Sequence, residues 1–123
     1  MERIETTILQ NLIFSEEYSR KVIPFIQPDY FEDRKEKIIF EEIIAFIVKY
    51  GSSITTEALN IEVENRTDLT DTEAKDIQEI TQNLKESVVD HQWLLDTTEK
   101  WCRDRAIYLA LICLLYTSDA ADE

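Results

Sequence analysis

The sequence is poor in residues that form tight turns, with one glycine and two prolines among 123 residues. So few turn formers cannot join many short strands, which disfavours an all-β sandwich. The single glycine also excludes phosphate-binding loops such as GxxxxGKS and dinucleotide-binding turns such as GxGxxG. Hydrophobic residues make up 44% of the chain. We therefore expect a globular all-α fold built around one core.

Basic residues are also scarce. The chain has 13 lysines and arginines against 26 aspartates and glutamates, which gives a net charge of −13. Binding to phosphates requires clustered lysine and arginine, so this composition predicts no direct binding of nucleic acid. An acidic surface is compatible with a basic partner protein.

Residues for catalysis or metal binding are few. His91 is the only histidine, and we expect it to face solvent at the start of a helix. Cys102 lies on an apolar stripe with no histidine at a helical neighbour position, which is typical of a core residue rather than a nucleophile. Cys102 and Cys113 are eleven positions apart, about 16 Å along one predicted helix, too far for a disulfide. We predict no catalytic, cofactor or metal site and a reducing cytoplasmic location.

Long apolar runs are missing too. The most apolar segment, residues 106–116, is shorter than the roughly 20 residues that cross a bilayer. The charged N-terminus, MERIETTILQ, lacks the apolar centre of a signal peptide. The sequence predicts no membrane partner.

What remains is a series of amphipathic patterns in the first half of the chain. Ile4, Ile8 and Leu12 predict a first helix, and Ser15 is placed to cap a second. Two prolines then interrupt the pattern. We expect the aromatic side chains near them to be buried in the core: Phe25, Tyr30 and Phe31.

The segment from residue 32 to Gly51 predicts the central helix of the core, ended by the glycine. Its apolar stripe is wide enough to predict burial on more than one side. The stripe comprises Ile38, Ile39, Ile43, Ile44, Phe46, Ile47, Val48 and Tyr50. Glu41 and Glu42 are interpreted as its solvated face.

Three further helices are expected. Thr55 or Thr56 caps a short one that buries Leu59 and Val63. Residues 70–73 have the spacing of a capping box. The apolar face that follows it comprises Ala74, Ile77, Ile80, Leu84 and Val88. The chain restarts at Asp90 into a long final helix.

The final helix carries two apolar stripes. One comprises Leu95, Cys102, Ala106 and Leu109, and the other comprises Trp93, Trp101 and Tyr108. Either the helix is buried on both sides, or the aromatic stripe forms an oligomer or partner surface, where tryptophan and tyrosine are enriched. The candidate interface residues are Trp93, Trp101, Arg105 and Tyr108.

Several segments, taken in order, resemble a known family. They are ILQNLIF, KVIPFIQPDYFE, KIIFEEI, ALNIEVEN and DHQWLLDTTEKWCRDRAIYLAL. Together they resemble the N-terminal domain of DnaB-type replicative DNA helicases, in particular those of T-even-like phages, over residues 1–112. Three family elements correspond to Asp29-Tyr30-Phe31, Ile39-Phe40 and Arg103-Asp104-Arg105-Ala106.

The resemblance implies a small helical head followed by the first arm of a helical hairpin. In the family such domains form the collar of a hexameric ring and engage primase, in the cytoplasm of the infected host for a phage protein. ATP and magnesium belong to a C-terminal motor that this sequence lacks, so no enzyme activity is expected of it. The alternative is a freestanding acidic helical adaptor.

The last residues, CLLYTSDAADE, end in small and acidic side chains that continue none of the preceding patterns. They resemble the translation of a transposase adaptor used to prepare DNA sequencing libraries. We therefore divide the sequence into a truncated helicase N-terminal domain, residues 1–112, and a tail at 113–123 that we expect to be an artefact.

Overall fold

The computed structural model describes residues 3–86 and 88–121. Within them the chain forms α1 (Ile4–Phe14), α2 (Glu16–Val22), α3 (Arg34–Tyr50), α4 (Thr56–Glu64), α5 (Asp71–Asn83) and α6 (His91–Ala121). Two short 3-10 turns, η1 (Ile23–Phe25) and η2 (Pro28–Tyr30), connect α2 to α3. The described residues contain no strand, so the all-α prediction is confirmed. Asp122 and Glu123, at the end of the predicted tail, lie outside the described residues.

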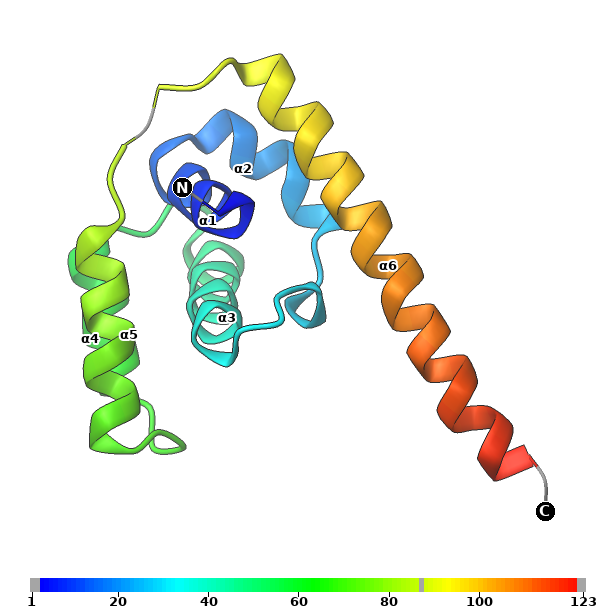
Figure 1. The fold of residues 1–123 in the computed structure, drawn as a ribbon. Coiled ribbons are helices and arrows are strands. Elements are labelled where there is room, and N and C mark those ends of the chain that lie inside the picture. The colour runs from blue at the N-terminus through cyan, green and yellow to red at the C-terminus, as the bar shows by residue number, and fades with distance from the viewer. Residues whose placement is uncertain (1–2, 87, 122–123) are drawn as a thin grey trace.

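Helices α1 to α5 form a head, and α6 runs along one side of it and then projects away (Figure 1). Helices α4 and α5 lie side by side next to α3, while α2 lies between α1 and the first turns of α6. None of the helices in the described part of the chain is both long and apolar enough to cross a bilayer.

The helix boundaries follow local chemistry. The side chains of Ser15 and Thr55 accept hydrogen bonds from the backbone amides of Tyr18 and Ala58, as predicted. The predicted capping box is present, with Thr70 and Glu73 each accepting the other's backbone N–H at 3.1 Å. Gly51 ends α3 with a φ of 72°, a left-handed conformation that side-chain-bearing residues rarely adopt.

The predicted central helix, α3, packs against α1, α4, α5 and η2, and it shares the centre of the core with α1. All residues from 7 to 13 are buried, which means that the head surrounds α1 on every side. In α3, burial extends only from Glu36 to Ile43. The predicted apolar stripe is therefore wrong at Val48 and Tyr50, which expose 79% and 57% of their surfaces, whereas Ile44, Phe46 and Ile47 are partly buried against the core.

Two other predicted burials are also wrong. Phe25 is 68% exposed, because η1 turns its ring away from the core, whereas Phe31 is buried as predicted. Helix α5 ends at Asn83, before the predicted apolar face is complete. Leu84 still reaches the core, but Val88 lies in the connection to α6 and is fully exposed.

Glu42 does not belong to a solvated face. Its carboxylate accepts a hydrogen bond from Arg66 at 2.8 Å, and its side chain is only 17% exposed. Arg66 also donates to Asp68, and this pairing lowers the pKa of Asp68 to about 2. The Arg66 side chain therefore connects α3 to the loop between α4 and α5.

Candidate protein-interaction site

One face of α6 packs against the head. Its buried residues recur at the spacing of a single helical face: Leu94, Thr98, Trp101 and Cys102. At the start of the helix, Asp90 accepts the backbone N–H of Trp93 at 2.8 Å, which caps the helix at the residue where the restart was predicted. The first three turns of α6 are thus held to the head by apolar burial.

A buried hydrogen bond joins α2 to α6. The hydroxyl groups of Tyr18 and Thr98 lie 2.6 Å apart, with both side chains inside the core. Burial raises the pKa of Tyr18, while the hydrogen bond with Thr98 acts in the opposite direction. The phenol therefore stays neutral and can donate or accept at this contact.

An aromatic cluster forms the second attachment. The ring of Phe31 lies 5.0 Å from that of Trp101 on α6 and 5.1 Å from that of Phe40 on α3, measured between centroids. Tyr30 meets Trp101 edge to face at 6.0 Å. These distances are within the range in which aromatic pairs stabilise a fold beyond their area.

Arg105 forms the last attachment between α6 and the head. Its Nε donates to the backbone carbonyl of Tyr30 at 2.6 Å, and its Nη1 donates to the Glu32 carboxylate at 3.2 Å. The side chain is only 14% exposed. Its guanidinium also lies 4.8 Å from the ring centroid of Tyr108, over the ring face.

The three elements that carry the family resemblance meet at this junction. Residues 29–31 supply the carbonyl and two of the rings, residues 39–40 supply the ring of Phe40, and residues 103–106 supply Arg105. They are far apart in the sequence, with 75 positions between Tyr30 and Arg105. Their shared position indicates that these elements set the direction in which α6 leaves the head.

Beyond Arg105 the helix exposes apolar side chains. Ile107, Tyr108 and Leu111 are 54%, 47% and 57% exposed, and Trp93 is 52% exposed near the start of the helix. In Figure 1 the backbone of this section of α6 projects beyond the helices of the head. Exposed apolar surface of this kind marks sites of protein association.

The predicted aromatic stripe is therefore divided between two environments. Trp101 and Arg105 face the head, whereas Trp93 and Tyr108 are exposed. The structure differs here because eight positions of helix turn the side chain by about 80°, so Trp93 and Trp101 do not share a face. The sequence interpretation also missed Leu94, although the spacing of Leu94, Thr98 and Trp101 matches a buried face.

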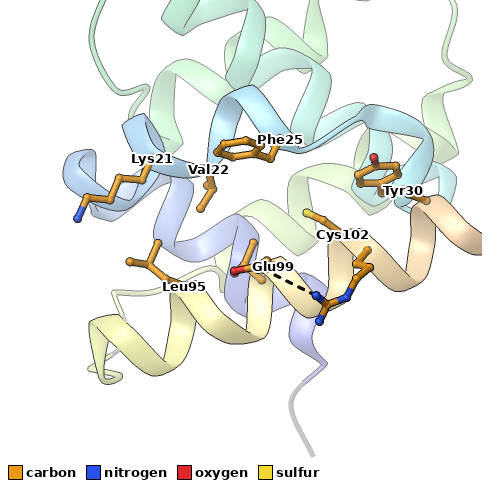
Figure 2. A pocket seen from close by; sticks show the side chains of 10 residues that line it. Lys21, Val22, Phe25, Tyr30, Leu95, Glu99 and Cys102 are labelled. Atoms are coloured by element: carbon orange, nitrogen blue, oxygen red, sulfur yellow. Dashed lines mark ion pairs between the residues drawn. The ribbon is translucent and has the colours of Figure 1, made fainter.

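A groove lies between α2, η1 and the part of α6 that packs against the head (Figure 2). Its volume is about 570 Å³. Val22, Leu95 and Cys102 contribute apolar surface, and the exposed ring of Phe25 forms part of its wall. Burial raises the pKa of the Cys102 thiol to about 11, so the thiol is protonated near neutral pH and is a poor nucleophile.

The residue types that could bind a metal ion are spread over the structure. In the described ranges, no three His, Cys, Asp or Glu side chains gather in a way that could hold a metal ion. His91 is 39% exposed at its side chain and lies 3.8 Å from Glu17. Its position at the start of α6 agrees with the prediction, but the ring is only partly exposed and its Nε2 atom is buried, so His91 does not simply face solvent.

Taken together, the fold and these surfaces define a helical domain with a compact head and one helix held outward by a specific junction. Residues 1–92 match the family described as the DnaB-like helicase N terminal domain. The chain belongs to this family, which confirms the resemblance found in the sequence.

A relative from Enterobacteria phage T4 is described as a DnaB-like replicative helicase. The two sequences are 36% identical over 103 residues, which make up 84% of this chain and 22% of that protein. The chain therefore spans about a fifth of the length of the relative.

Proposed function

We propose that this chain acts as the N-terminal scaffolding domain of a phage replicative DNA helicase, in the cytoplasm of the infected host. In this role it contributes to a hexameric collar and docks primase, while a separate motor domain uses ATP and magnesium. The chain itself then binds no nucleotide and catalyses no reaction.

The observation that supports this proposal best is the convergence of the three family elements on the junction between the head and α6. A domain that only needed a stable core would not require a largely covered arginine to hold one helix by a backbone carbonyl outside the bundle. A collar subunit does require this, because each copy must present its projecting helix in a defined direction.

The charge of the chain supports a contact with protein rather than DNA. The basic side chains at the head surface are largely paired with carboxylates, as in the contacts of Arg20 with Glu16 and of Arg34 with Glu73. Such pairing leaves few cations for phosphates.

Mixing the chain with the primase encoded by the same phage tests the docking role. We expect the two proteins to sediment together, and we expect an Arg105→Ala variant, in which α6 is no longer held at Tyr30, to bind less primase. Separate sedimentation of the two proteins, under conditions where each is folded, would contradict the docking role.

A further inference from the structure

The groove between α2, η1 and α6 has the shape of a binding site for a helix. Its lining on α6 runs from Leu95 to Ala106, about 16 Å of helix or three turns. Phe25 stands at its wall with 68% of its surface exposed, although it is one of the largest apolar side chains of the head. A groove of this length can receive side chains from successive turns of a second helix.

The polar groups of the groove restrict what it can bind. The backbone groups along α2 and α6 are used within the helices. The hydroxyl of Thr98 is engaged by Tyr18 at 2.6 Å. An extended peptide would therefore bury backbone N–H and C=O groups without partners, which is costly. A helix satisfies its own backbone and avoids this cost.

The rim adds a preference of charge. Two cations and one carboxylate line the groove: Lys21, Arg103 and Glu99. The side chains of Lys21 and Arg103 are 52% and 61% exposed. Their ion pairs with Glu17 and Glu99 are 3.6 Å and 3.9 Å long, too long for strong hydrogen bonds. In a chain of net charge −13, the groove is a place where cations outnumber carboxylates. Lys21 and Arg103 keep unused donors beside apolar surface, and a carboxylate of a partner would complement them.

We propose that this groove binds the apolar face of an amphipathic helix from a partner protein, with acidic side chains of that helix placed against Lys21 and Arg103. The residues that line the groove do not include Ile107, Tyr108 or Leu111, which are exposed beyond the junction. The groove can therefore be occupied whether or not copies of the chain associate through the outer part of α6, and it does not depend on the proposed collar.

Panning a library of displayed short helical peptides against the purified chain tests this inference. We expect enrichment of peptides that carry apolar residues at helical spacing and acidic residues at the edges of that face. Enrichment of basic or extended sequences, or no enrichment above background, would overturn the proposal.

Affinities of an enriched peptide for matched variants locate its site. Phe25→Ser should weaken binding at least about tenfold, because it removes an aromatic wall. Val48→Ser, which removes an apolar side chain as exposed as Phe25 but outside the groove, should leave the affinity within about twofold. Equal effects of the two substitutions would show that the peptide binds elsewhere.

The charge preference has its own test. A Lys21→Glu, Arg103→Glu variant should lose the acidic peptide and gain a peptide in which lysine replaces the acidic residues. Lys100→Glu on the same helix serves as the control, since Lys100 is also exposed and also pairs with an acid four residues away, Asp104, but lies outside the groove. If a medium-chain fatty acid binds the groove and no helical peptide does, the site is a lipid site and the proposal is wrong.

Discussion

The head and the outer half of α6 contain similar apolar residues in opposite environments. In the head, Ile43 and Ile39 are fully buried, whereas Ile107 and Leu111 on α6 expose more than half of their surfaces. The boundary between the two regions is Arg105, which makes the last contact between α6 and the head by donating to the carbonyl of Tyr30. The comparison shows that an apolar stripe predicts a contact but does not say whether that contact lies within the chain or with another protein.

The largest difference between the two regions should appear in stability. Ile43→Ala removes a fully buried side chain from the head and should lower the free energy of unfolding by about 2–5 kcal/mol. The matched substitution Ile107→Ala, at a position that is 54% exposed, should change it by no more than about 0.5 kcal/mol. Chemical denaturation of both variants measures the difference, and equal losses would mean that the outer part of α6 is buried in solution.

Sequence reasoning found most of this fold because the signals were local. The caps at Ser15 and Thr70 and the stop at Gly51 depend on residues a few positions apart. The exposure of Val48 and Tyr50 in the second half of α3 could not be predicted this way. The apolar pattern of this half is as strong as that of the first half, but which turns are covered depends on where distant helices end.

The junction was predictable only in part. The resemblance drew attention to residues 29–31 and 103–106, but no local pattern indicates that Arg105 donates to the carbonyl of Tyr30. The role of Glu42 was missed for a similar reason, since its partner Arg66 lies 24 positions away. Contacts of this kind follow from the packing of the whole head and leave no periodic signal in the sequence.

The buried carboxyl group of Glu36 should make the stability of the head depend on pH. Burial raises the pKa of Glu36 from 4.5 to about 7, although its contact with Arg3 acts in the opposite direction. The folded state therefore favours the neutral carboxyl group. As pH rises from about 4.5 to about 7, the unfolded chain loses this proton first, and stability should fall by about 1–3 kcal/mol.

The variant Glu36→Gln should lack this fall, so it should be more stable than the original chain above the titration range and similar to it below. Glu62→Gln, at an exposed position of α4, serves as the control and should follow the original chain. Denaturation curves recorded across the pH range decide the matter. Parallel curves for the original chain and Glu36→Gln would show that Glu36 is not the group responsible.

The attachment between the two regions should show coupling of a smaller size. Tyr18→Phe removes one partner of the buried bond to Thr98 and should cost about 1 kcal/mol. The double variant Tyr18→Phe, Thr98→Val should cost less than the two single variants added together, because neither hydroxyl is then left unpaired. Simple additivity in this cycle would mean that the two hydroxyl groups do not interact.

The smallest effect is expected at the end of the chain. Helix α6 continues to Ala121, but Leu114 and Leu115 are 65% and 70% exposed and bury little surface. Truncation after Ile112 should therefore change the free energy of unfolding by no more than about 0.5 kcal/mol. A larger loss of stability, measured by thermal denaturation beside the full chain, would give the predicted tail a structural role.

Sedimentation over a range of concentrations tests the central claim most directly, namely that the junction presents the outer part of α6 for association. We expect the chain to associate as its concentration rises and Leu111→Glu to remain monomeric with unchanged stability. Ala110→Glu, an exposed neighbour on the same helix, should still associate. A chain that stays monomeric at every concentration, or a Leu111→Glu variant that unfolds, would contradict the account.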